Sequence, residues 1–195
     1  MKIGKVGPLL VALVMATAIS PAGVTNAAGP EPPSTDRAQG LLYSLTTGLL
    51  AHDIDGLWSG SRKEGGVDVS IEATLNIPAR ALLAGIVRVN TGLTLNDRGD
   101  TSTVYAGLLW EREIGSELFL TIGVGLAAHD GALEAGDNSK KALGSSLLFR
   151  VPLELGYTAY DRHRFSVAFA HISNAYLASP NEGLDTVGLR YTYLF

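Results

Sequence analysis

The sequence predicts an all-β protein, an eight-stranded antiparallel β-barrel of the outer-membrane type. Three observations lead to this fold class. Apolar and polar residues alternate with a period of two over most of the chain, the alternation falls into eight segments separated by turn residues, and the last segment ends on the aromatic residue Phe195. Even numbers of alternating segments about ten residues long are typical of outer-membrane barrels, and eight is the smallest common strand count.

The N-terminus has the pattern of a secretory signal peptide, which we expect to cover residues 1–27. Two lysines precede an apolar stretch from Val6 to Ile19, and small residues lead up to Ala27, after which a signal peptidase would cut. Cleavage after Ala22 is the second choice. A membrane-anchoring helix is disfavoured because the apolar stretch is short and breaks at Pro21.

Composition excludes several classes of protein. Residues 28–36 are rich in proline and polar residues and are expected to form a flexible lead-in to a barrel over residues 37–195. The chain has no cysteine, which excludes disulfides, a thiol nucleophile and a cysteine-based zinc site. A net charge of -4 without a basic cluster excludes a nucleic-acid partner. We expect neither a cofactor nor a metal ion.

The eight segments are expected at residues 41–51, 66–76, 82–93, 102–113, 117–129, 143–158, 163–173 and 184–195. In the second segment, apolar residues from Val67 to Leu75 alternate with polar residues from Asp68 to Asn76. The fifth segment repeats the pattern from Leu118 to Leu126, and the sixth repeats it from Leu143 to Tyr157. Each of these segments therefore predicts a strand with one apolar and one polar face.

The polar side of the strands decides between two kinds of barrel. It carries charged residues of both signs, namely Asp68, Glu72, Arg88, Glu111, Arg150, Glu154 and Arg190. These charges could pair inside a narrow membrane barrel, whereas a soluble lipocalin-like barrel would have to place them outside, in water. In the last segment Tyr191, Tyr193 and Phe195 share the apolar face, and the tyrosines fit an aromatic girdle at a membrane interface. The terminal aromatic residue resembles the assembly signal of bacterial outer-membrane barrels, so the membrane barrel is favoured.

Loop lengths predict the orientation of the barrel. Short turns are expected at residues 76–81, 112–116 and 159–163, and longer loops at residues 53–65, 95–101, 130–142 and 174–183. Short turns of such barrels face the periplasm and longer loops lie outside. The end of the seventh segment and the start of the eighth are therefore expected at the outer end.

A histidine, a serine and an acid lie close together at that end. His171 and Ser173 are two residues apart and share a strand face, and Asp185 opens the next strand. All three fall on the lipid-facing side, where polar residues are costly without a function. Histidine is the usual base for a serine nucleophile, and an acid on its other ring nitrogen fixes the tautomer. The pattern predicts a catalytic triad, and the simpler interpretation is an interfacial histidine beside a loop-starting serine.

The C-terminal stretch resembles a known family. The motifs that carry the resemblance are His171 to Ala175, Pro180 to Asp185, Gly188 to Tyr191 and Asn90 to Gly92. They are similar to segments of the PagL lipid A 3-O-deacylases. The resemblance implies a membrane-embedded esterase of the bacterial outer membrane that removes the 3-O-linked acyl chain of lipid A, the lipid part of lipopolysaccharide, in the outer leaflet. It also implies Ser173 as nucleophile, His171 as base and Asn174 as part of the oxyanion hole.

Two positions depart from the family pattern. The orienting acid is typically glutamate, whereas this chain has Asp185, which is one methylene shorter. Glu182 is the alternative acid, but it has the other parity and lies in the loop, so Asp185 is preferred. A small residue usually stands where this chain has Tyr176, and a backbone conformation that only glycine tolerates there would compromise the oxyanion hole.

Other interpretations stay open at the level of the sequence. One is a non-enzymatic structural or adhesive barrel, and another is an acyltransferase that passes the acyl group to an acceptor other than water. A homodimer is left open as well. The remaining polar residues are interpreted as structural: His129 is expected in a solvated turn with Asp130, and His52 and its neighbouring acids lack a third ligand at metal spacing. Trp58 is expected near the lipid headgroups.

Overall fold

The structure is a computed structural model that describes residues 40–136 and 138–195. The signal peptide expected over residues 1–27 and the lead-in expected over residues 28–36 lie outside the described residues. No helix in the described part of the chain is long and apolar enough to cross a membrane.

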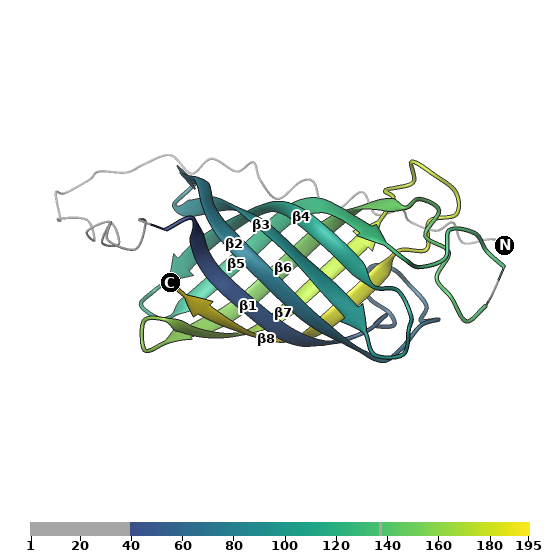
Figure 1. Cartoon of the computed structure of the whole chain (residues 1–195), viewed down its shortest axis with the longest axis horizontal. Coiled ribbons are helices and arrows are strands. Elements are labelled where there is room, and N and C mark those ends of the chain that lie inside the picture. Colours follow the sequence, from purple (N-terminus) through teal and green to yellow (C-terminus); the bar gives the residue numbers. More distant parts are fainter. Residues whose placement is uncertain (1–39, 137) are drawn as a thin grey trace, which may run out of the picture. The chain divides into compact units, whose positions relative to one another are not determined.

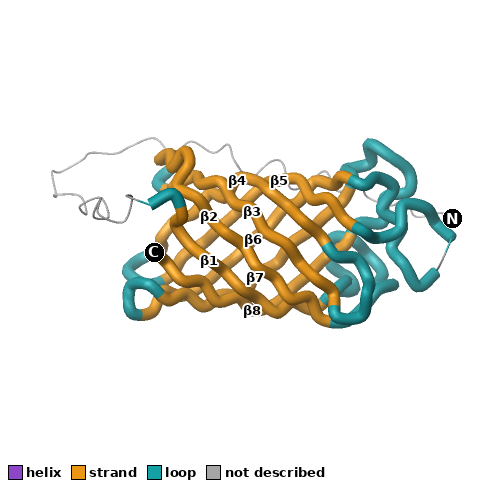
Figure 2. Tube along the Cα trace, viewed as in Figure 1, coloured by secondary structure: helices purple, strands orange, loops and turns teal. Residues whose placement is uncertain are grey.

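Eight antiparallel strands close into a barrel (Figures 1 and 2). Each strand pairs with its neighbours in the sequence, and β1 closes the barrel by pairing with β8. The strands are β1 (Leu42–Ala51), β2 (Val67–Leu82), β3 (Gly85–Asn96), β4 (Thr103–Ile114), β5 (Leu118–His129), β6 (Leu147–Ala159), β7 (His163–Ser173) and β8 (Leu184–Leu194). The predicted fold class, an all-β eight-stranded antiparallel barrel, is confirmed.

The outer wall of the barrel is apolar. Leu49 in β1, Val104 in β4 and Leu189 in β8 are 62%, 62% and 67% exposed. Their neighbours along each strand point inward, so the apolar side of the alternation faces out. An apolar exterior on a closed barrel suits a bilayer, because the strands satisfy one another's backbone hydrogen bonds and leave no edge.

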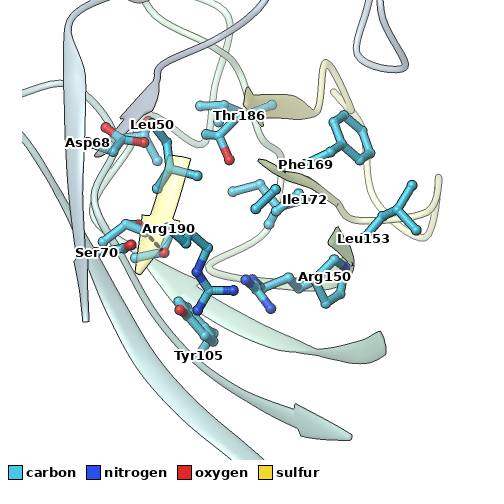
Figure 3. Close-up of a pocket in the computed structure, with 17 residues that line it drawn as sticks. Leu50, Asp68, Ser70, Tyr105, Arg150, Leu153, Phe169, Ile172, Thr186 and Arg190 are labelled. Atoms are coloured by element: carbon cyan, nitrogen blue, oxygen red, sulfur yellow. Dashed lines mark hydrogen bonds between the residues drawn. The ribbon is translucent and has the colours of Figure 1, made fainter. Parts of the chain in front are cut away.

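The interior holds the charged residues of the polar side, as the alternation predicts. The guanidinium of Arg190 lies 2.8 Å from Glu72 and 2.7 Å from Glu154. Figure 3 shows the guanidinium groups of Arg150 and Arg190 close to Tyr105, and that of Arg150 lies 3.9 Å from the centre of the Tyr105 ring. Burial of these charges is tolerable because they are paired.

A cavity of about 40 Å³ lies among these interior residues (Figure 3). Arg150, Arg190 and Ile172 are part of its lining. The neighbours of Ile172 in β7, His171 and Ser173, have the opposite parity and point away from the interior. None of the three residues of the predicted triad is part of the cavity lining.

β2 departs from the expectation. The turn predicted at residues 76–81 is wrong, because β2 passes through this stretch with a shift in its register to β3 and runs on to Leu82. The hairpin turns at Leu83 and Ala84, whose φ angles are 48° and 58°. Proline, which stands at position 78, is a residue type that favours turns, whereas leucine and alanine do not favour positive φ.

β6 begins later than expected. The strand predicted from residue 143 starts at Leu147, because the preceding residues belong to the β5–β6 loop. Leu143 is completely buried in that loop, and its N–H donates to the carbonyl of Ala132 at 2.9 Å. Leu143 is therefore an apolar residue that packs in the loop. In the sequence its position continues the alternating pattern of β6, which predicts it as part of the strand.

The connections at the two ends of the barrel differ in length. Long loops gather at one end, among them the β1–β2 loop (residues 52–66), the β5–β6 loop (residues 130–146) and the β7–β8 loop (residues 174–183) (Figures 1 and 2). The opposite end carries short turns and the C-terminus. The end of β7 and the start of β8 therefore lie at the long-loop end.

Candidate active site

β7 and β8 bring His171, Ser173 and Asp185 together. His171 pairs with Asp185 in the antiparallel ladder, so the two side chains are neighbours on one face. Ser173 shares this face because it lies two residues beyond His171. The face is the outer one, since Phe165 and Val167, which have the same parity, are 56% and 55% exposed.

Hydrogen bonds link the three side chains in a row. Nδ1 of His171 lies 2.6 Å from Oδ1 of Asp185, and Nε2 lies 2.9 Å from Oγ of Ser173. A carboxylate can only accept, so Nδ1 carries the proton and Nε2 is left to accept from the serine hydroxyl. This is the tautomer that a histidine needs to act as base toward serine.

The triad of Ser173, His171 and Asp185 faces outward but is covered by the β1–β2 loop. His171 is 5% exposed and Asp185 is 0% exposed. The ring of Trp58 stacks on that of His171 with a centroid distance of 4.3 Å and an interplanar angle of 10°. The N–H of Ser59 donates to Oδ2 of Asp185 at 2.6 Å. Sequence reasoning missed both contacts, because no local pattern joins this loop to strands so distant in the chain.

Glu182, the alternative acid, is engaged elsewhere. Its carboxylate accepts hydrogen bonds from Nζ of Lys63 at 2.5 Å and from the N–H of Ala142 at 2.8 Å. Burial raises the pKa of Glu182, but the bonds to Lys63 and Ala142 outweigh burial, and the net pKa is lowered. Glu182 therefore ties three loops together, and Asp185 is the acid in contact with His171.

Asn174 anchors the β7–β8 loop. Its Nδ2 donates to the main-chain oxygens of Leu143 at 2.9 Å and Pro180 at 2.8 Å, and its backbone N–H donates to the side chain of Asn181 at 2.9 Å. Gly144 packs against this anchor so closely that a Cβ there would lie 1.8 Å from the oxygen of Pro180. Every N–H of Asn174 is occupied, so its side chain holds two loops together in this structure.

Ala175 and Tyr176 form the turn that follows. Their φ angles are 52° and 63°, and the N–H of Leu177 closes the turn on the oxygen of Asn174 at 3.0 Å. This left-handed helical region costs a residue with a side chain roughly 1–2 kcal/mol, but it does not require glycine. Within the described residues, no protein acceptor pairs with the N–H groups of Ala175 and Tyr176. Adjacent free N–H groups of this kind can bind an anion.

A buried ion cluster of His52, Asp68 and Glu64 supports the loops. His52 is 1% exposed, and its ring nitrogens lie 2.9 Å from each of the two carboxylates. Burial lowers the pKa of His52, but the hydrogen bonds to both acids outweigh burial and raise the pKa to about 9. Burial raises the pKa of Glu64, and the bond to His52 lowers it, with a net value of about 2. Glu64 also accepts from the N–H groups of Lys141 and Thr101, which joins three loops.

His129 and Asp130 have structural partners. Nε2 of His129 contacts the oxygen of Ser145 at 2.7 Å, and Nδ1 accepts from the N–H of Gly131 at 3.1 Å. Asp130 accepts from the N–H of Ser102 at 2.7 Å. These contacts belong to the loops and do not extend to the triad.

The fold and these contacts define a class of protein: small barrels of the outer-membrane type that carry a serine–histidine–acid triad on the wall. A comparison with family models gives the particular family. The chain belongs to the PagL family, because the model described as lipid A 3-O-deacylase (PagL) matches residues 58–194.

Individual proteins are also similar to this chain. The lipid A deacylase PagL of Bordetella bronchiseptica is 32% identical over 81 residues, which are 42% of this chain and 43% of the relative. The match thus spans less than half of that relative's length. The crystal structure of the outer membrane enzyme PagL is similar with a TM-score of 0.58 and 21% identity, over 78% of this chain and 99% of that one. Neisserial surface protein A is similar with a TM-score of 0.51 and 12% identity, over 80% and 98% of the two chains. At such identities the structural likeness concerns the fold.

Proposed function

We propose that this protein is an esterase of the bacterial outer membrane that hydrolyses the 3-O-linked acyl chain of lipid A. The observation that carries the proposal is the position of His171, which contacts the Ser173 hydroxyl on one side and the Asp185 carboxylate on the other. Membership of the PagL family and the relative named lipid A deacylase support the substrate. The apolar outer wall supports the location in a membrane.

Ser173 acts as the nucleophile in this proposal. As Oγ attacks the ester carbonyl carbon, Nε2 of His171 takes the hydroxyl proton, and Asp185 stabilises the resulting imidazolium. His171 then returns the proton to the departing sugar oxygen, the ester bond breaks, and the acyl chain stays on Ser173. Water, deprotonated by the same Nε2, hydrolyses this acyl-enzyme and releases the fatty acid. The route needs no cofactor or metal ion.

Backbone amides stabilise the oxyanion in this scheme. The free N–H groups of Ala175 and Tyr176 follow Ser173 closely in the chain, and the left-handed turn fixes their direction. Donors preorganised around a developing oxyanion typically contribute on the order of 3 kcal/mol each. Asn174, for which the family resemblance implies a place in the oxyanion hole, contributes by anchoring this turn through Leu143.

The surroundings of Ser173 suit a substrate that stays in the membrane. Its ladder partner Phe149 is 40% exposed on the same outer face, and Tyr176 and Leu177 in the adjoining loop are 74% and 79% exposed. A long acyl chain can lie along this apolar wall while its ester carbonyl reaches Ser173. Binding energy from the chain then positions the carbonyl for attack.

Purified protein acting on lipid A in mixed micelles tests the proposal. We expect release of one hydroxy fatty acid by the wild-type protein and none by His171→Ala. The matched control is His163→Ala at the other end of β7, where the ring contacts Tyr191, and it should keep full activity. A folded wild-type barrel that releases no fatty acid would identify a structural or adhesive barrel. Transfer of the acyl chain to a second lipid without hydrolysis would identify an acyltransferase.

A further inference from the structure

Trp58 covers one face of the His171 ring. The two rings are stacked, with centroids 4.3 Å apart and planes 10° from parallel. Both ring nitrogens are used along the edge, by Asp185 and Ser173, so the face is the part of the ring that a further residue can contact. Trp58 is 41% exposed while His171 is 5% exposed. The indole therefore shields the imidazole and keeps its own outer side free.

The loop that carries this indole is held against the triad. The residue after Trp58, Ser59, donates its N–H to Asp185 at 2.6 Å. Gly183 permits the close approach, because a Cβ there would lie 3.1 Å from Cε1 of His171 and 3.4 Å from Cβ of Ser59. The backbone next to the indole is thus held by Asp185, and the indole itself is stacked on His171.

We propose that Trp58 is a positioning residue, which stabilises the cationic form of His171 and holds its ring in line with Ser173. The inference rests on the proposed function, in which His171 is the base. The face of an indole attracts a cation within about 6 Å of the ring centre, and more strongly where water is excluded. Because the cation forms as Ser173 loses its proton, the attraction lowers the barrier and leaves substrate binding little changed.

None of the other groups that contact the His171 ring in the described part of the chain stabilises a cation at the face of the ring. Asp185 on β8 is the one charged side chain in the described part of the chain that hydrogen-bonds to His171. Ser173 on β7 and the backbone of Ser59 in the β1–β2 loop are neutral. Asp185 acts at the edge of the imidazolium and Trp58 acts at its face, so the two contributions are separable by substitution.

Substitution of Trp58 by leucine and by phenylalanine distinguishes the effect of its aromatic face from the effect of its side-chain volume. We expect Trp58→Leu to lower kcat about tenfold and to change KM by less than about threefold, while Trp58→Phe keeps kcat within about threefold of wild type. The acid limb of the pH–rate profile should move to lower pH in Trp58→Leu, because the imidazolium has lost a stabilising partner. The matched control is Trp110→Leu at the short-turn end, where the indole donates to the oxygen of Leu82.

Two kinetic outcomes would overturn the proposal. One is a Trp58→Leu protein with the kcat and the acid limb of the wild type. The other is an equal loss of kcat in Trp58→Leu and Trp58→Phe, which would mean that side-chain bulk matters and the aromatic face does not.

A fluorescence titration tests the contact without the reaction. The chain has two tryptophans, so Trp58 is the only one left in Trp110→Phe. An imidazolium in contact with an indole quenches it, so emission should fall on acidification and should not fall in this way when His171→Ala is added. The protein could show a fall in emission that depends on His171 and yet not hydrolyse lipid A. This result would refute the proposed function, but it would support the contact between Trp58 and His171. Hydrolysis of lipid A without such a titration would overturn the role of Trp58.

Discussion

His171 and Asp185 are ladder partners in β7 and β8, and their Nδ1 and Oδ1 atoms lie 2.6 Å apart. The strand register sets this distance, and the connecting loop does not. An aspartate directly opposite the histidine reaches the ring without any shift of the hairpin. The side chain that is one methylene shorter than the glutamate typical of the family therefore still makes the contact.

Removal of the acid should be far more damaging at Asp185 than at Glu182. We expect Asp185→Ala to lower kcat/KM by on the order of 10³ to 10⁴, because His171 loses its tautomer control and the charge that stabilises the imidazolium. Glu182→Ala should stay within about tenfold, since Glu182 binds Lys63 and Ala142 and does not contact His171. Kinetics on lipid A in mixed micelles measures both, and the reverse ranking would transfer the role to Glu182.

Gly144 should be essential to the site although it lies in another loop. An added Cβ would meet the oxygen of Pro180 at 1.8 Å, and its φ of 72° already disfavours a side chain. We expect Gly144→Ala to move the Asn174 anchor and to lower kcat about 10 to 100-fold. Gly136→Ala is the matched control, because nothing lies within 4 Å of its added Cβ. Equal activity of the two variants would mean that catalysis does not depend on the Asn174 anchor.

The sequence predicts the triad because strand periodicity is enough to place it. Parity puts His171 and Ser173 on one face, and the outward side of β8 then supplies Asp185. The contacts of Trp58 and Ser59 could not be predicted in this way, since a long loop has no period and its folding over β7 and β8 is a tertiary event. The β2–β3 turn was missed because Leu83 and Ala84 adopt the positive φ angles of a two-residue hairpin, against the preference of their residue types.

The ion cluster around His52 should make the loops sensitive to alkali. The pKa of His52 is raised from 6.5 to about 9, so its contribution to stability is complete below pH 6.5 and is lost as pH rises through 9. The pKa of Glu64 is lowered from 4.5 to about 2, so its contribution is complete above pH 4.5 and is lost as pH falls through 2. The cluster is therefore most stabilising between pH 4.5 and 6.5.

Replacement of His52 tests this window. The stability difference between wild type and His52→Gln, measured by thermal unfolding, should be largest between pH 4.5 and 6.5 and should shrink above pH 9. Leu57→Ala, at an exposed position of the same loop, should follow the wild type at every pH. A difference that does not vary with pH would mean that His52 acts by packing alone.

The membrane-facing position of Ser173 predicts substrate preference. Short, freely soluble esters do not gather on the apolar wall and lose the binding energy of a long acyl chain. We therefore expect kcat/KM for a short soluble ester to be lower than that for lipid A in mixed micelles by at least about a hundredfold. Equal kcat/KM values for the two substrates would contradict a lipid-facing site.

The most direct test is mass spectrometry of lipid A from bacteria that express the wild-type chain or Ser173→Ala. Both proteins should assemble as heat-modifiable barrels, because the serine side chain takes no part in the backbone ladder. The wild-type chain should remove one hydroxyacyl chain from lipid A, and Ser173→Ala should leave lipid A intact. Unchanged lipid A in cells with the folded wild-type barrel would contradict the proposed hydrolysis of lipid A. The same loss of a hydroxyacyl chain with Ser173→Ala would contradict Ser173 as the nucleophile.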